Sequence, residues 1–159
     1  MTARFKLKRS DGRIYLERWG WECRQFGVFI HRMDAPDPGL DLHDHPFWFA
    51  SLILWGGYTE ERCRSFLAPY WAARAERLNI ARRGNRRHRR WLSVASTPLH
   101  FCHRITELDR SPTWTLVVRG RKLQKWAFYL PTGRMDWQEY DRTVRAERRD
   151  LWRDDAPDV

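Results

Sequence analysis

The fold of this 159-residue chain is decided by residues 39–60, GLDLHDHPFWFASLILWGGYTE. His43 and His45 stand two residues apart at the start of a run with high β propensity, and Gly56-Gly57 ends that run. Because residues i and i+2 of a strand point to the same face, we expect one face to carry the alternate residues His43, His45, Phe47, Phe49, Ser51 and Ile53. Two imidazoles that converge in this way can hold a transition metal if a third ligand arrives from elsewhere.

Further β-prone segments, bounded by Gly and Pro turns, follow one another along the chain. From the N-terminus they are Arg13–Trp19, Phe26–Met33, His45–Trp55, Tyr58–Phe66, Trp91–Ala95, His103–Leu108, Thr113–Val118 and Lys125–Leu130. Many short strands at this spacing indicate an all-β sandwich or barrel.

The other segments are arms, turns and one ambiguous stretch. Residues 1–12 are polar and end in a turn signal, so we expect an N-terminal arm. Residues 67–90 contain either a short helix or an irregular crossing followed by a strand at Ala75–Ile80. Residues 135–159 carry a modest apolar stripe and predict a short C-terminal helix and tail. Without an internal repeat, residues 1–159 are predicted to form one domain.

The spacing around the paired histidines resembles the first motif of the cupins. In that family His-x-His is followed by three or four residues, Glu, six residues and Gly. Here His43 and His45 are followed by three residues, Phe49, six residues and Gly56. The spacing therefore matches, and the glutamate is missing.

A second segment is similar to the second cupin motif, which contains Pro-x-Gly-x-x-His. Pro98-x-His100-x-x-His103 matches it, with His100 where glycine is usual. The leading glycine of the first motif is displaced to Gly39, and Glu107 replaces the asparagine that ends the second. The resemblance therefore covers residues 39–107.

The resemblance implies the double-stranded β-helix, a jelly-roll-like barrel, over residues 13–131, and a metal bound by His43, His45 and His103. His100 lies in the same short segment and is the alternative third ligand. Because the glutamate is missing, the site resembles the three-histidine sites of thiol and diketone dioxygenases, which hold Fe(II). Zn, Ni and Mn serve other cupins. The chain looks like the cupins met in phage and actinobacterial genomes.

The inward faces of several strands would line a pocket beside these ligands. Ser51 and Tyr58 are its expected polar members. Its expected walls, for which core packing is the alternative interpretation, are Trp114, Val117 and Phe128.

Several other ionisable side chains lie near the motifs in sequence. One of Glu60 and Glu61 is expected to face the site, and the other to be solvated. His31 is expected to be an ordinary, partly buried histidine, and His88 a solvated one.

The chain is strongly basic, with 30 Lys and Arg residues against 20 Asp and Glu and a net charge of +10. Six arginines lie in residues 82–90, where we expect a turn at the tip of a hairpin. The candidate contacts to an anionic or nucleic-acid partner, which would bind with strong salt dependence, are Arg86, Arg87, Arg89 and Arg90. A solvated basic loop is the alternative interpretation, and no zinc-finger, helix-turn-helix or RNA-recognition motif accompanies the run.

Three cysteines, Cys23, Cys63 and Cys102, form no Cys-x-x-Cys motif, so a reducing, cytoplasmic compartment fits them best. The basic N-terminus has no apolar core of a signal peptide behind it, and no apolar run approaches the length of a membrane span. We therefore expect no membrane partner, and the family resemblance allows a homodimer.

Three functional hypotheses follow. The first is a metal-dependent cupin enzyme, a dioxygenase-type oxidoreductase or an isomerase, acting on a small or modified substrate. The second is a non-catalytic cupin module that binds a small ligand in its barrel and an acidic partner through its arginines. The third is a structural protein, such as a phage component, in which the histidines only pack. The fold alone does not choose among them, because cupins carry many unrelated activities.

Overall fold

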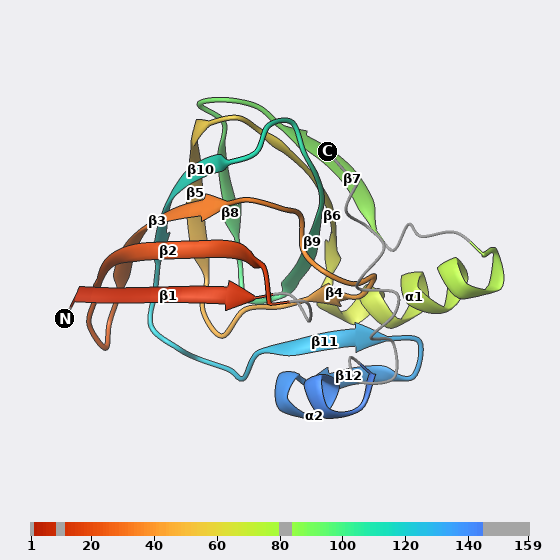
Figure 1. Cartoon of the computed structure of the whole chain (residues 1–159). Helices are drawn as coiled ribbons and strands as arrows, with labels where there is room; N and C mark the ends of the chain where they lie inside the picture. Colours follow the sequence, from red (N-terminus) through yellow and green to blue (C-terminus); the bar gives the residue numbers. More distant parts are fainter. Residues whose placement is uncertain (1, 9–11, 80–83, 145–159) are drawn as a thin grey trace.

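Short alternating runs separated by Gly and Pro turns fold here into strands. The computed structural model describes residues 2–8, 12–79 and 84–144, and these residues form two six-stranded antiparallel sheets (Figure 1). The first sheet contains, in spatial order, β1 (Thr2–Lys8), β2 (Ile14–Glu22), β3 (Gly27–Met33), β10 (Thr113–Arg119), β5 (Phe49–Trp55) and β8 (Val94–Thr97). The second contains β12 (Gly133–Asp136), β11 (Ala127–Leu130), β4 (Leu42–His43), β9 (Phe101–Leu108), β6 (Tyr58–Arg64) and β7 (Asn85–Arg89).

The path of the chain alternates between the two sheets. β3 and β5 belong to the first sheet, whereas β4 and β6 belong to the second. The same exchange recurs from β8 through β9 and β10 to β11. Such a path winds two sheets into a jelly roll, so the predicted all-β, double-stranded β-helix is confirmed.

The histidine stretch itself crosses from one sheet to the other. β4 ends at His43 and β5 begins only at Phe49, so the single strand predicted from His45 to Trp55 is wrong at its start. Pro46 lies in this crossing, where its missing N–H costs no ladder hydrogen bond. Gly56 adopts a φ of 78° between β5 and β6. These two strands belong to different sheets and do not pair with each other, so the hairpin that Gly56-Gly57 predicts is wrong, and the two glycines mark a second crossing between the sheets.

One helix resolves the ambiguous stretch after β6. A 3₁₀ turn, η1 (Ser65–Leu67), leads into α1 (Ala68–Arg77), which has a proline in its first turn. Its buried residues are Ala68, Ala72 and Ala75, at helical spacing. The alternative prediction, a strand at Ala75–Ile80, is therefore wrong.

A second helix closes the described part of the chain. α2 (Trp137–Arg142) begins after Asp136, whose side chain accepts a hydrogen bond from the N–H of Gln138 at 2.9 Å. Tyr140 is its buried residue. The short C-terminal helix is thus confirmed, and the rest of the predicted tail, residues 145–159, lies outside the described residues.

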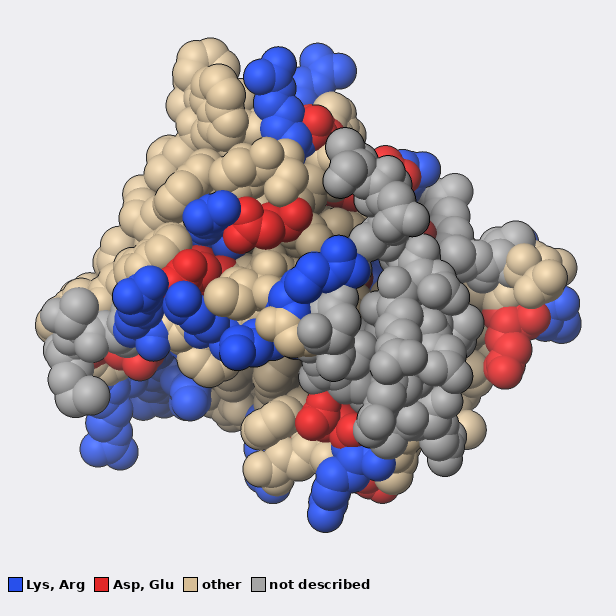
Figure 2. All heavy atoms as spheres, in the orientation of Figure 1, with Lys and Arg blue, Asp and Glu red and all other residues tan. Residues whose placement is uncertain are grey.

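Two polar segments are strands rather than irregular structure. The predicted N-terminal arm contains β1, which pairs with β2, and the predicted arginine turn contains β7, which pairs with β6. Both are edge strands, where charged side chains protect the open edge from further pairing. Basic and acidic side chains lie interspersed on the face shown in Figure 2. Arg4 of β1 pairs with Glu17 of β2 at 2.8 Å.

Three apolar clusters stabilise these layers. One lies between the sheets and contains Met33, Ile53, Tyr58 and Ile105. Two others lie where α1 and α2 cover the second sheet, around Ala68 and Tyr140 respectively. The helices of the described residues are too short and too polar for any of them to span a membrane.

Candidate metal centre and cavity

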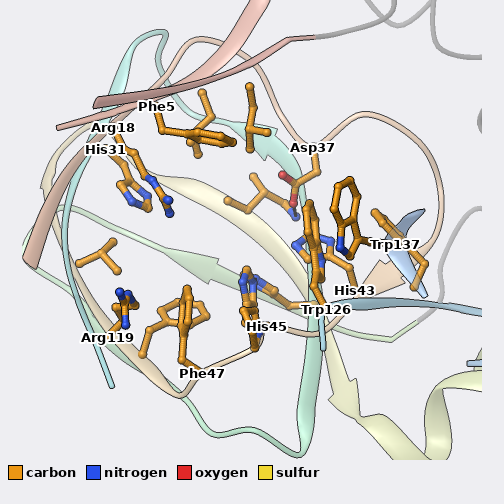
Figure 3. Close-up of a pocket in the computed structure, with 18 of the residues that line it drawn as sticks. Phe5, Arg18, His31, Asp37, His43, His45, Phe47, Arg119, Trp126 and Trp137 are labelled. Carbon is orange, nitrogen blue, oxygen red and sulfur yellow. Dashed lines mark hydrogen bonds between the residues drawn. The ribbon is translucent and has the colours of Figure 1, made fainter. Parts of the chain in front are cut away.

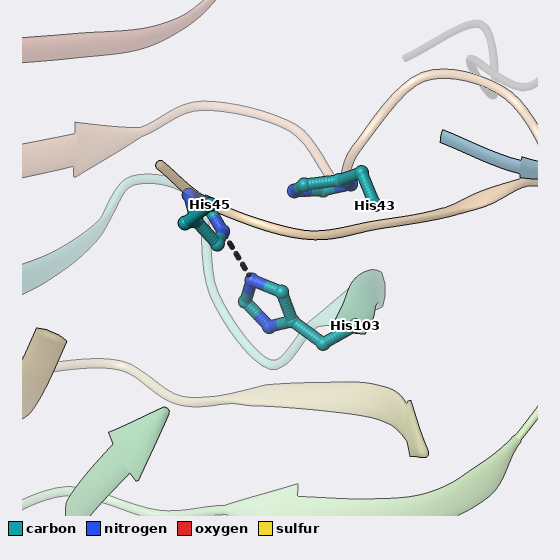
Figure 4. A group of neighbouring side chains, drawn as sticks. All are labelled: His43, His45 and His103. Atoms are coloured by element: carbon teal, nitrogen blue, oxygen red, sulfur yellow. Dashed lines mark hydrogen bonds between the residues drawn. The ribbon is translucent and has the colours of Figure 1, made fainter. Parts of the chain in front are cut away.

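Three histidines from two distant segments meet between the sheets. β4 pairs with β9 so that His43 lies directly opposite His103. His45 follows two residues after His43, and its Nε2 lies 2.9 Å from Nε2 of His103 (Figure 4). One ring nitrogen from each of the three residues lies within 4.8 Å of the others. The sheet register therefore brings the two sequence motifs together.

Burial favours the neutral form of two of these imidazoles. It lowers the pKa of His43 to about 4, although the carboxylate of Asp37 opposes this change. Burial also holds the pKa of His45 well below its ordinary value, and the neighbouring His103 and His43 lower it further. At neutral pH both rings therefore offer the lone pair that a metal requires.

Glu60 orients the third histidine. Its Oε2 accepts a hydrogen bond from Nδ1 of His103 at 2.9 Å, and only 2% of the Glu60 side chain is exposed. A register shift between β6 and β9 produces this contact, because Thr59 pairs with Glu107 whereas Glu60 pairs with Ile105. Such bulges re-aim side chains next to functional sites. With Nδ1 engaged, Nε2 of His103 faces the cluster.

The residue between the paired histidines anchors their loop. Asp44 points away from the cluster and accepts hydrogen bonds from the N–H of Ala127 at 2.8 Å and the hydroxyl of Tyr129 at 2.9 Å. Burial raises the pKa of this carboxyl. Asp44 thus fixes the crossing that carries His43 and His45, as the hydrogen-bonded supports around metal ligands do.

Phe49 stands where the cupin motif has its glutamate. Its ring centroid lies 4.7 Å from that of His45 and 5.7 Å from that of His103. An aromatic ring therefore packs against the cluster at the position of the missing carboxylate. Among the described residues the candidate metal-binding cluster thus consists of imidazoles alone.

A cavity of about 790 Å³ opens beside the three histidines, between the two sheets (Figure 3). Ser51 and Tyr58 line it, as do Val117 and Phe128. Trp114 does not, contrary to the prediction. It lies on the outer side of β10, where its ring stacks on Trp19 at 5.8 Å. Thr113, Thr115, Val117 and Arg119 are the buried residues of this strand, so the alternation excludes Trp114 from the interior.

Sequence reasoning missed several other residues that line the cavity. They include Asp37 and Trp126 beside His43, and Arg18, His31 and Arg119 further along the first sheet (Figure 3). The alternation of β3 places His31 on one face with Phe29 and Met33, which are both buried. Extending that alternation to the neighbouring strands would have found Arg18, but no sequence signal marks Trp126.

The remaining histidines lie apart from the cluster. His100 is exposed and its ring packs 5.0 Å from that of Phe101, so the structure does not bring it to the other three. His88 is exposed as predicted, and its Nε2 lies 2.8 Å from a carboxylate oxygen of Asp109.

The arginine run is partly neutralised by carboxylates. Arg89 binds Glu60 through its guanidinium at 2.9 Å, and Arg86 pairs with Glu107. Arg87 and Arg90 are exposed on or just after the edge strand β7. Arg82 and Arg83, also part of the run, lie outside the described residues. Glu61, expected to be solvated, is instead buried and paired with Arg104 at 3.3 Å.

Comparison with known proteins places the fold. No family model matches the sequence, and no curated protein matches it either. Among solved structures, Fe(II) HppE superposes on 74% of this chain and 56% of its own with a TM-score of 0.53 and 9% identity. Fe(II)-HppE with the alternative substrate (S)-1-HPP covers 75% and 55% of the two chains, with a TM-score of 0.51 and 10% identity. A variant of Streptomyces PAC13 with uridine covers 80% and 83%, with a TM-score of 0.51 and 8% identity.

The chain thus spans just over half the length of the HppE chain. At identities of 8 to 10% these likenesses concern the fold. They support the jelly-roll architecture independently of the strand order. The chain therefore shares its jelly-roll fold with these solved structures.

Proposed function

We propose that this chain is a metal-dependent enzyme of the cupin superfamily, which binds one transition-metal ion through His43, His45 and His103. One observation carries the proposal: three imidazole nitrogens from two segments lie within 4.8 Å of one another at the wall of a cavity of about 790 Å³. A three-histidine set leaves coordination positions open, which a catalytic metal needs and a structural metal does not. The partner is a small molecule in that cavity.

The residues around the cluster fit a bound ion. Glu60 fixes the His103 ring through Nδ1, so that Nε2 is the nitrogen available to the metal. Nε2 of His45, 2.9 Å away, faces the same point. Both nitrogens would be ligands of one bound ion, and metal binding would release the proton of the hydrogen bond that joins them here. Aromatic rings surround the site, among them those of Phe49, Trp126 and Phe128.

Fe(II) is the metal that we propose, with an oxidoreductase activity of the dioxygenase type. Imidazole ligands suit iron among other first-row metals, and a protein of the same fold, HppE, was solved with Fe(II). When bound, the ion would supply Lewis acidity and the capacity to react with oxygen. The chain would contribute the walls that orient the substrate, together with the carboxylate of Asp37 beside His43 (Figure 3).

Elemental analysis of protein purified without a histidine tag tests the proposal. We expect about one equivalent of a transition metal in the wild type and its loss in His43→Ala. His100→Ala is the matched control, because His100 is exposed and lies in the same segment as His103, and it should retain the metal.

Each outcome of the metal determination has a defined meaning. No metal in the wild type, even after incubation with Fe(II), Ni(II) and Zn(II), would refute the metal centre. Iron, with oxygen consumption on turnover, would support the oxidoreductase, whereas zinc or nickel would refute the dioxygenase assignment and leave the metal centre standing.

A further inference from the structure

The end of the cavity away from His43 is lined by basic side chains. Arg18 of β2 and His31 of β3 are direct cross-strand partners, and both project into the cavity (Figure 3). Arg119 of β10 lines the same cavity. It pairs with Gly27 of β3, four residues before His31 along that strand. Charged side chains on the inner face of a barrel require an explanation, because such positions are normally apolar.

Three buried side-chain nitrogens of residues that line this cavity have no hydrogen-bond partner among the described residues. They are Nε of Arg18, Nε2 of His31 and Nε1 of Trp126. The arginine and tryptophan nitrogens can only donate, and the histidine nitrogen donates in one of its tautomers. Leaving such donors unsatisfied is costly. A ligand that satisfies them must therefore bring acceptor atoms.

The charges at this end of the cavity do not balance. Arg119 donates to the carboxylate of Glu22 and, at 2.8 Å, to the carbonyl of Gly120. Burial lowers the pKa of Arg18, while the same Glu22 raises it and Arg119 lowers it further. The carboxylate of Glu22 thus interacts with the guanidinium groups of both Arg18 and Arg119. Lys122 adds another positive charge at the cavity wall. An anion bound here would supply the missing negative charge.

The acidic residues of the cavity belong to its other side. Asp37 is in the loop before β4, where it accepts a hydrogen bond from the N–H of Ile105 at 2.8 Å. Asp136 and Asp141 belong to the segment that ends β12 and forms α2. The cavity is therefore basic at the β2–β3 end and carries its carboxylates near the histidine cluster.

We infer that the substrate of this site is a small organic anion, whose carboxylate or phosphoryl oxygens bind Arg18 and His31 while its apolar part extends towards His45; this inference rests on the proposed function. The aromatic residues between the two ends are Phe29, Phe47 and Phe49. The guanidinium of Arg18 lies 4.8 Å from the ring of Phe29 and 4.8 Å from that of Phe5, which fixes its orientation. The anion is held by a planar donor group with a histidine beside it, an arrangement suited to carboxylate and phosphoryl oxygens.

Calorimetric titrations of the metal-free protein test this inference. The probes are phenylphosphonate and benzoate, with neutral benzamide as their uncharged analogue, in a buffer free of phosphate. We expect at least one anion to bind at least tenfold more tightly than benzamide, and its affinity to fall at least tenfold in Arg18→Gln. Comparing the two anions shows which of the two groups the site takes. Arg87→Gln, which removes one positive charge from the exposed edge strand β7, should change the affinity less than twofold.

Two further variants separate this inference from the proposed function. His43→Ala should lose the metal and still bind the anion. Arg18→Gln should retain the metal, and its affinity for the metal should change less than twofold. Should Arg18→Gln fail to fold, His31→Gln decides, with the same expected loss of anion affinity.

Three results would overturn the inference. They are equal affinity for benzamide and for both anions, unchanged anion affinity in Arg18→Gln, or anion binding that disappears in His43→Ala instead. The last result would place the anion at the metal ligands. A protein that binds the anion as expected but never a metal would leave the basic site standing and refute the metal centre.

Discussion

Replacement of Glu60 by glutamine tests the architecture of the candidate metal centre with a change of a single group. Glu60 accepts a hydrogen bond from Nδ1 of His103 and another from Arg89, both at 2.9 Å, and its side chain is 2% exposed. Glutamine has one acceptor oxygen and one donor nitrogen in place of two acceptors. Whichever way the amide lies, one of the two donors now faces another donor.

The metal affinity should fall as a consequence. With the amide oxygen on the charged Arg89, the amide nitrogen faces Nδ1 of His103 and favours the tautomer that carries its proton on Nε2. That nitrogen then has no lone pair for the metal. Loss of the group that orients a metal-binding histidine weakens metal binding about 10- to 100-fold, or about 1.4 to 2.7 kcal/mol.

The affinities can be measured by competition between the untagged protein and a chromophoric chelator for Co(II) or Zn(II). Glu61→Gln is the matched control, because Glu61 is the next residue, is also buried, and pairs with Arg104. We expect it to lower the melting temperature while changing the metal affinity less than twofold. Wild-type affinity in Glu60→Gln, or an equal loss in Glu61→Gln, would refute the orienting role of Glu60.

Three other predictions concern stability. Burial lowers the pKa of His31 to about 3. Below about pH 6.5 the unfolded chain therefore binds a proton at His31 that the folded chain does not. This difference should lower the free energy of unfolding by about 2 kcal/mol between pH 7.5 and 5. In urea unfolding of the metal-free protein, His31→Gln should lose about 2 kcal/mol less stability than the wild type between pH 7.5 and 5. The same pH dependence in the variant and the wild type would contradict this prediction. Asp44→Asn should cost about 1 to 3 kcal/mol in the same assay, because the carboxylate accepts from Ala127 and Tyr129 inside the protein; a neutral result would refute its anchoring role. Arg18→Met should raise the melting temperature of the ligand-free protein, since it removes a guanidinium whose Nε has no partner; a lower melting temperature would identify Arg18 as a structural residue.

The alternation around the paired histidines can be read from the sequence. His43, His45, Phe47, Phe49 and Ser51 all line the cavity, as a period of two requires. What that period does not reveal is that the segment leaves one sheet and enters the other within these residues. Alternate residues continue to face the interior of the barrel across such a crossing. The alternation of inward residues is therefore kept although the strand is interrupted.

The errors have equally local causes. As a large apolar residue, Trp114 is a natural candidate for the pocket, yet the buried face of β10 carries threonines on either side of it, and tryptophan stacking covers the outer face. The arginines of β7 resemble a turn because no apolar residue alternates with them. An edge strand needs only backbone pairing, which β6 provides. Side-chain composition does not encode that pairing partner.

The basic end of the cavity shows why charge is the least readable feature of this sequence. Arg18 and Arg119 occupy inward positions of their strands, and among the thirty basic residues of the chain neither stands out. In the structure they depart from the rule that inward positions of a small barrel are apolar, and they do so together, around one cavity. Departures from local consistency that cluster in space are expected at functional sites, because elsewhere their cost would have no compensation. The imidazole cluster at one end and the guanidinium groups at the other give the cavity a direction. A substrate that is anionic at one end and reactive at the other would be oriented by that difference alone.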